Sequence, residues 1–372
     1  MYDDLDKFEP VAKIVVIGVG GAGNNAVNRM IEDNIGSVEF YVANTDKQTL
    51  ALSKAPNKII LGENLTGGLG AGGLPEIGKK AANESKEEIK KILEGKDMLF
   101  IAAGMGGGTG TGAAPVIAQI AKELGLLTVA VVTRPFSFEG NIKIEYSIFG
   151  INELSKVVDS IIIESNDKLL LIGGNMTVSK AFEESDAVLA RCVKTVTDMI
   201  LTPFLMNIDF ADVKNVLKES GIALIGYGTG SGEGKCKEAV ENAINSPLLE
   251  TGINGARRAI CAITFGPQII MNEINEVITL IKKYSDQELN IKFALSKNPA
   301  LGDDIIVSII ASDYENAHEI LNQNSKAFDF SSINESKSED NSLTEAEDNN
   351  EVSTEDILPN FLEDDEDENK PY

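Results

Sequence analysis

The sequence predicts an α/β protein in which a doubly wound, mostly parallel sheet is followed by a long helix and a smaller α/β unit. Three observations predict this class. Continuous apolar, β-branched runs alternate with amphipathic helical patterns, as is typical of parallel strands buried on both faces. Glycine-rich turns join two of these runs to the helices that follow them. From residue 322 onward the chain is rich in Ser, Asn, Asp and Glu, so we expect a disordered tail.

The first half of the chain supplies the parallel strands. Residues 13–18 (KIVVIG) form an apolar run that passes through glycines into a helical pattern. Residues 75–95 form one amphipathic helical pattern, as expected of a helix that covers the sheet. Together these segments predict a domain over residues 13–176, preceded by an N-terminal extension, residues 1–12. The further strand patterns cover residues 38–46, 96–104, 126–135 and 158–165.

The second half begins with a long helical pattern over residues 177–202, which ends before Pro203. A smaller α/β unit is expected over residues 203–321. Its strand patterns cover residues 221–230, 256–266, 290–298 and 305–312, and its helical patterns cover residues 211–219, 234–246 and 271–285.

The tail divides into an acidic linker, residues 322–355, and a terminal segment, residues 356–372. An apolar island in this segment, DILPNFL, begins at Asp356 and ends at Leu362. The chain has a net charge of −25, and residues 331–372 hold 15 acidic side chains against two lysines. Such acidity disfavours nucleic acid as a partner.

Several function classes are disfavoured by what the sequence lacks. It has no run of 18 apolar residues and begins with an acidic segment, so we expect a cytoplasmic protein without membrane insertion. Cys192, Cys236 and Cys261 are far apart, which favours packed thiols over a disulfide framework or a zinc site. His318 is the single histidine, so catalysis by a serine or cysteine triad is not expected.

Two glycine clusters are the main candidate site. The first, GVGGAGNN at residues 18–25, satisfies a dinucleotide-binding fingerprint together with Asp46, which leaves a nicotinamide-dependent oxidoreductase as an alternative. The second, GMGGGTGTG at residues 104–112, contains six glycines and two threonines between a strand and a helix. Two such turns aim main-chain N–H groups and helix dipoles at one ligand. They suit a di- or triphosphate, with Thr109 and Thr111 as hydroxyl donors to the terminal phosphate.

A polar cluster, NIDFADV at residues 207–213, precedes a helical pattern. Its two carboxylates, Asp209 and Asp212, are three residues apart and share one face of that helix. The ordinary explanation is that Asp209 caps the helix and Asp212 is solvated.

The glycine-rich GGGTGTG resembles the signature of the FtsZ family of tubulin-like GTPases, as do GVGGAGNNAVNRM, VANTDKQ, VTRPFSFEG, NDKLL and NIDFADV. The resemblance implies GTP binding with Mg²⁺, a central helix joining two domains, and head-to-tail polymerisation into the cytokinetic ring of bacterial cell division. It also implies that Asn207, Asp209 and Asp212 reach the nucleotide of the neighbouring subunit and position the attacking water. This reverses the ordinary explanation of the two carboxylates.

The resemblance also assigns nucleotide contacts. Glu139 is the implied ribose contact, and Lys143 stands where an arginine that reaches phosphate is common. Asn166, Phe182 and Asp186 are the implied guanine pocket. The implied phosphate contacts are Gly20, Gly21, Gly23, Asn24, Asn44, Gly104, Gly107, Gly108, Thr109, Gly110 and Thr111.

This chain departs from the family pattern at several positions. Gly68 and Leu74 replace an arginine and an asparagine in TGGLGAGGLP, a segment expected to lie as a flap or surface loop near the phosphates. Lys143 gives a point charge where arginine gives a bidentate fork. We expect nucleotide binding to survive these changes, although they leave open a tubulin-like protein that binds GTP without turnover.

The tail is expected to carry the partner interactions. DILPNFL resembles the FtsZ peptide that binds membrane adaptors and division regulators at midcell. The acidic residues that follow it disfavour direct attraction to anionic lipid.

Overall fold

The computed structural model describes residues 12–172, 176–201, 205–206, 208–244, 253, 255–284 and 289–315. These residues all belong to one unit of the chain, Met1–Ala327. The expectations made for residues 1–11, Asn207, His318 and residues 322–372 lie outside the described residues.

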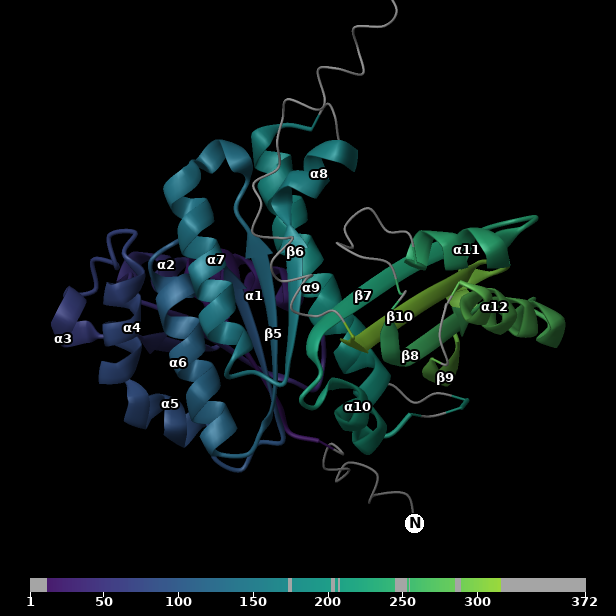
Figure 1. The fold of residues 1–372 in the computed structure, drawn as a ribbon, viewed down its shortest axis with the longest axis horizontal. Helices are drawn as coiled ribbons and strands as arrows, with labels where there is room; N and C mark the ends of the chain where they lie inside the picture. Colours follow the sequence, from purple (N-terminus) through teal and green to yellow (C-terminus); the bar gives the residue numbers. More distant parts are fainter. Residues whose placement is uncertain are drawn as a thin grey trace, which may run out of the picture. The chain divides into compact units, whose positions relative to one another are not determined.

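Within the described residues, ten strands form one sheet, which Figure 1 shows in part. They are β1 (Ile14–Val19), β2 (Glu39–Asn44), β3 (Asn57–Ile60), β4 (Met98–Gly104), β5 (Leu127–Arg134), β6 (Ser160–Ser165), β7 (Gly221–Gly230), β8 (Ala256–Phe265), β9 (Asn290–Lys297) and β10 (Ile305–Tyr314). Their order is β3-β2-β1-β4-β5-β6-β7-β10-β8-β9. Every pairing from β3 to β7 is parallel, whereas β10 lies antiparallel between β7 and β8.

Helices flank both faces of this sheet. The described helices are α1 (Gly20–Glu32), α2 (Lys47–Leu52), α3 (Glu63–Thr66), α4 (Pro75–Glu84), α5 (Lys86–Leu93), α6 (Thr109–Glu123), α7 (Asn141–Ser155), α8 (Asn166–Ile172), α9 (Val178–Leu201), α10 (Phe210–Leu217), α11 (Lys235–Ile244) and α12 (Met271–Lys283). The 3₁₀ turns in the described part of the chain are η2 (Ser137–Glu139) and η3 (Pro299–Leu301). The α/β class predicted from the sequence is confirmed, while the domain boundaries remain predictions.

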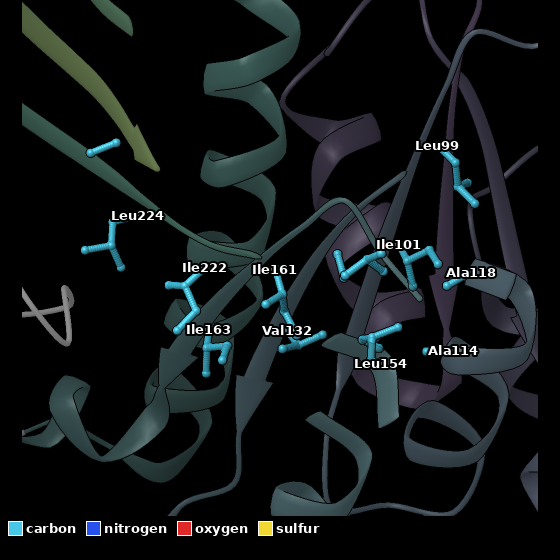
Figure 2. Close-up of a cluster of buried hydrophobic side chains, with 14 of the residues drawn as sticks. Leu99, Ile101, Ala114, Ala118, Val132, Leu154, Ile161, Ile163, Ile222 and Leu224 are labelled. Atoms are coloured by element: carbon cyan, nitrogen blue, oxygen red, sulfur yellow. The ribbon is translucent and has the colours of Figure 1, made fainter. Parts of the chain in front are cut away.

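Alternate side chains of the parallel strands enter two different cores, because successive residues of a strand point to opposite faces. Leu99 and Ile101 of β4 pack with α4, α5, α6 and α7 in the first core. Met98 and Phe100 pack with α1, α9 and α10 in the second core. Figure 2 shows the first core running from β4 and α6 across to Ile222 and Leu224 of β7. The apolar interior is therefore continuous between the two halves of the chain.

Two features of the fold differ from the sequence pattern. Residues 75–95 form two helices, α4 and α5, separated at Ser85. The Ser85 hydroxyl accepts from the Gly62 amide (3.1 Å) and donates to the Ile60 carbonyl (3.3 Å). The helix is therefore interrupted at the residue whose side chain bonds the neighbouring loop. The short edge strand β3 was not predicted, because its four residues carry little periodicity.

Among the described helices none combines the length and apolarity needed to cross a bilayer, and this includes the 24-residue α9.

Candidate functional site

The order of the parallel strands reverses between β1 and β4. The chain passes from β1 to β2 on one side and from β4 to β5 on the other, and Val19 pairs with Ala103 near the ends of the two central strands. Ligands of open α/β sheets bind at such a switch point, beyond the carboxyl ends of the strands. Both glycine clusters follow these two strands, so the topology brings them to the same end of the sheet.

The two glycine turns approach each other closely. A Cβ atom added to Gly20 would lie 2.9 Å from the Gly110 amide nitrogen, and one on Gly108 would lie 2.8 Å from the Leu74 nitrogen. The loop before α4 therefore packs against the second turn. Gly21 and Gly107 have no atom within 4 Å of an added Cβ, so their main chains face open space. A ligand can approach the backbone there.

Two buried amides support the first turn. With the amide nitrogen of Asn24 facing the carbonyl oxygens of Gly18 and Gly20, it donates to them at 3.0 and 2.9 Å. In that orientation the Asn24 oxygen accepts from Asn44 Nδ2 at 3.3 Å. Asn44 is the last residue of β2, so the two predicted phosphate contacts form one network.

The hydroxyls of the two threonines in the second turn make hydrogen bonds within the protein. Thr109 Oγ1 lies 2.7 Å from Thr45 Oγ1, and Thr111 Oγ1 accepts from the Gly106 amide at 2.9 Å. Both side chains are buried. These hydrogen bonds hold the shape of the turn, and donation of either hydroxyl to a phosphate stays a prediction. Thr45 was not singled out from the sequence, since its partner is 64 residues away.

The predicted ribose contact lies on η2. Glu139 Oε1 accepts from the Phe136 amide at 2.9 Å, and its other oxygen accepts from Lys143 Nζ at 2.9 Å. A Cβ added to Gly106 would lie 2.7 Å from the Lys143 carbonyl oxygen. The start of α7 thus lies beside the second glycine turn, and the charge of Lys143 is directed to Glu139.

Aromatic rings gather around Phe182, one of the residues that the resemblance assigns to a base pocket. Phe182 of α9 is half exposed and meets the buried Phe136 edge to face, with ring centroids 5.1 Å apart. Phe138 stacks on Phe136 at 5.0 Å. Asn166, at the start of α8, accepts from the Ser185 hydroxyl at 2.7 Å. Residues from α8, α9 and the turn after β5 therefore meet at one place.

Asp186 of α9 has an unusual titration. Burial raises the pKa of the Asp186 carboxyl to about 7, and the nearby Glu183 carboxylate adds to this increase, while a hydrogen bond with the Asn25 amide opposes it. Asn25 belongs to α1, directly beyond the first glycine turn. The predicted base-recognition residue is therefore joined to the helix that follows the first turn. Asn25 lies within the first glycine cluster, and no local sequence pattern links it to Asp186.

Asp46, which supported the dinucleotide alternative, is the N-cap of α2. Its carboxylate accepts from the amides of Gln48 (2.8 Å) and Thr49 (3.3 Å) and from the Thr49 hydroxyl (2.9 Å). These bonds lower the pKa of the carboxyl, with that from the Thr49 hydroxyl as the largest contribution. Asp46 therefore acts as a helix N-cap, a position at which aspartate is strongly preferred.

The acidic pair of NIDFADV lies near the amino ends of the parallel strands, which form the edge of the sheet opposite the glycine turns. Asp209 caps α10 by accepting from the Asp212 amide at 2.8 Å, so the capping expected from the sequence is present. Asp212 is not simply solvated, because its Oδ1 accepts from Lys292 Nζ of β9. At the far end of α10, the Leu217 carbonyl accepts from the hydroxyl of Ser160, the first residue of β6.

Ser160 marks the amino ends of the parallel strands, whereas the glycine turns follow their carboxyl ends. Figure 1 shows α8, which directly follows β6, at the top and α10 at the bottom. The acidic pair and the two glycine turns therefore lie on opposite edges of the sheet.

The departures from the family pattern have local explanations. Gly68 has a φ of +78°, and a Cβ there would lie 2.5 Å from the Lys47 side chain. An arginine at this position would be strained and would displace Lys47. Leu74 is the N-cap residue of α4 and makes no capping hydrogen bond. Its replacement of asparagine thus leaves the start of α4 without a side-chain cap.

Comparison with known proteins agrees with this geometry. Residues 13–174 match the GTPase domain of the Tubulin/FtsZ family, and residues 221–315 match the C-terminal domain of the FtsZ family. An empty FtsZ dimer structure from M. jannaschii is 42% identical, covers 81% of this chain and 88% of its own, and has a TM-score of 0.76.

A point-mutant FtsZ structure from the same organism gives 41% identity, 82% and 92% coverage and a TM-score of 0.77. GDP-bound CetZ1 from Haloferax volcanii, at 21% identity, covers 84% of this chain and 98% of its own with a TM-score of 0.71, and shares the fold. The oxidoreductase alternative is therefore wrong. The chain belongs to the Tubulin/FtsZ family and is a GTPase that binds GTP and GDP.

Proposed function

We propose that this GTPase polymerises head to tail and that each active site is completed by the next subunit. The observation that carries the proposal is the separation of the glycine turns and the Asp209–Asp212 pair to opposite edges of the sheet. Within one subunit the acidic pair and the glycine turns are held apart. The acidic pair of one copy can meet the glycine turns of another copy only when the amino ends of the strands in the first copy face the carboxyl ends in the second. Such a heterologous contact produces open filaments. The FtsZ dimer of M. jannaschii, 42% identical, supports self-association.

The triphosphate is held mainly by main-chain N–H groups at the two glycine turns. Gly21 and Gly107 present backbone to open space, and the amino ends of α1 and α6 add favourable helix dipoles. We assign the buried threonines and amides of these turns a supporting role, since they are bonded to the protein. The phosphate-binding segment then comprises Gly20, Gly21, Gly23, Asn24, Asn44, Gly104, Gly107, Gly108, Thr109, Gly110 and Thr111.

The guanine base stacks on Phe182 and is recognised by Asp186, with Asn166 beside it and Glu139 at the ribose. A carboxylate accepts from both N1–H and the 2-amino group of guanine, and adenine has neither donor at these positions. Because a buried acceptor left unpaired is costly, such a site can discriminate by roughly 10⁴-fold.

A Mg²⁺ ion would balance the phosphate charge. Among the described residues, no group of three or more His, Cys, Asp or Glu side chains could hold a metal by itself. A magnesium ion commonly binds through substrate phosphates and water with few protein ligands, so the site fits an ion that arrives with GTP. It would supply stabilisation of the charge that develops on the phosphates.

Hydrolysis begins when the acidic loop of one subunit reaches the nucleotide of the next. Asp209 and Asp212, with Asn207, orient the attacking water toward the terminal phosphate by accepting hydrogen bonds from it. Assembly therefore switches hydrolysis on, and loss of phosphate weakens the contact.

In the cell we propose a role in cytokinesis, as a filament ring at the division site in the cytoplasm. The segment from Asp356 to Leu362 would bind a membrane adaptor or another division regulator.

The shared site is tested by mixing Asp212→Asn protein with wild type. The variant should bind GTP with unchanged affinity, because its own nucleotide edge is intact, and it should enter polymer. Turnover per pelleted subunit should fall in proportion to the variant fraction, since each variant loop inactivates one neighbouring site. Constant turnover per pelleted subunit at every mixing ratio would contradict the proposal. An independent check is the dependence of turnover on wild-type concentration, which should show a threshold coinciding with light scattering.

A further inference from the structure

The loop that carries the acidic pair is attached at two points to β9, the outermost strand of the sheet. At its start, the amides of Leu205 and Met206 approach the Leu295 carbonyl oxygen at 2.8 and 3.4 Å, and the Leu295 amide donates to Met206 at 3.2 Å. At its end, Lys292 Nζ donates to Asp212 Oδ1. Both Leu295 and Lys292 belong to β9, the last strand of the sheet. This strand thus holds the loop on both sides of Asp209.

Strand geometry places Lys292 on the face that contacts α10. Residues two apart share a face of a strand, and Ala294 is buried in the second core, which includes residues of α9 and α10. Phe293 and Leu295 pack against the first core instead. The other lysine of the strand, Lys297, falls on that opposite face. The contact with Asp212 is therefore particular to Lys292.

The two carboxylates of the loop are held in different ways. Asp209 is fixed by its cap bond to the Asp212 amide, whereas the Asp212 side chain is fixed by Lys292. An exposed ion pair contributes only about 0–1 kcal/mol to stability, which is a weak reason to place a lysine there. Lys292 does, however, set the direction of Asp212 and offset its charge. In a chain of net charge −25, that offset reduces repulsion between the loop and a neighbour's triphosphate.

We propose that Lys292 is a positioning residue for GTP hydrolysis: it holds Asp212 in the orientation in which it acts on the neighbouring nucleotide. This inference rests on the proposed function, in which Asp212 completes the next subunit's site. Lys292 acts through Asp212, and its own subunit's nucleotide lies at the other edge of the sheet. Its removal should therefore change turnover and leave nucleotide affinity unchanged.

Four variants test the role: Lys292→Met, Lys292→Arg, Lys297→Met and Asp212→Asn. For each, turnover per pelleted subunit, the critical concentration and the GTP dissociation constant are measured. We expect Lys292→Met to lower turnover about 10- to 100-fold, the size of effect produced by small misplacements of catalytic groups. Lys292→Arg should restore most of the loss because it keeps the cation. Lys297→Met, on the other face of the strand, should match wild type.

The proposal is overturned if polymerised Lys292→Met hydrolyses GTP within twofold of the wild-type rate per pelleted subunit. It is also overturned if Lys292→Arg does not restore turnover. If Lys292→Met does not polymerise alone, it is mixed with excess wild type. Turnover must then fall with the variant fraction in the pellet, and exclusion from wild-type polymer would overturn the positioning role. The Asp212→Asn arm separates the two proposals. Full turnover by that variant rejects the shared site itself, whereas loss of turnover in Asp212→Asn alone rejects only the role of Lys292.

Discussion

At the scale of single residues, the proposed role of Asp186 in base recognition links nucleotide binding to protonation. Its carboxyl has a pKa of about 7 because burial disfavours the charged form. In the proposed function guanine donates two hydrogen bonds to the ionised form, so its binding should lower this pKa and release a proton from the fraction that was protonated. Affinity is therefore fully present above pH 7 and is lost as the pH falls through that value.

We accordingly expect GDP affinity to fall by about tenfold between pH 8 and pH 6, the change in the ionised fraction of a group with a pKa near 7. Calorimetric titration of the wild-type protein at both pH values measures this ratio. Phosphate protonation also contributes, and Asp186→Asn reports that part alone because its side chain does not titrate. The same pH dependence in the variant and the wild type would refute the link to Asp186.

At the scale of elements, the amino end of α4 has residues that favour the start of a helix but lacks a side-chain cap. Pro75 occupies its first turn and Glu76 places a negative charge near the positive end of the helix dipole. Leu74 stands at the N-cap with extended backbone angles and is 50% exposed. This conformation suits an asparagine, whose side-chain oxygen accepts from an amide of the first turn.

Leu74→Asn is expected to raise the free energy of unfolding by about 1 kcal/mol, the usual value of a side-chain cap. Urea unfolding at constant nucleotide concentration measures the change. Leu52→Asn is the matched control, because Leu52 is also an exposed leucine but lies at the end of α2. Equal effects of the two substitutions would show that the gain comes from surface polarity and not from capping.

At the scale of the whole molecule, the two halves share one sheet and one apolar interior. The parallel contact between β6 and β7 joins Ser160 to Gly221 and Ile161 to Ile222. Both cores contain side chains from each half. A structure connected in this way is expected to unfold as one cooperative unit.

The three cysteines, all buried as expected from the sequence, report on this cooperativity. Cys192 lies in α9, whereas Cys236 and Cys261 lie in α11 and β8. Burial raises the pKa of all three thiols, that of Cys236 to about 11, so native protein should react slowly with iodoacetamide. Pulse labelling across a urea gradient, read by peptide mass spectrometry, should give one midpoint for all three. Labelling of Cys236 and Cys261 at lower urea than Cys192 would show that the halves unfold separately.

The sequence alone predicted every described strand except β3, most of the longer helices and the glycine turns, because periodicity and glycine content act over a few neighbouring residues. It also predicted the capping role of Asp209, which depends only on the following turn. It did not predict the break at Ser85, where a long-range bond to the loop around Ile60 and Gly62 ends the helix.

Only the tertiary structure decided which polar groups meet. Thr45 reaches Thr109 across 64 residues, and Lys292 reaches Asp212 across 80. Such pairs depend on the order of the strands and on the face that each side chain occupies, and no local pattern records either. The same strand order placed the glycine turns and the acidic pair on opposite edges, which is why the proposed catalytic site requires a second copy of the chain.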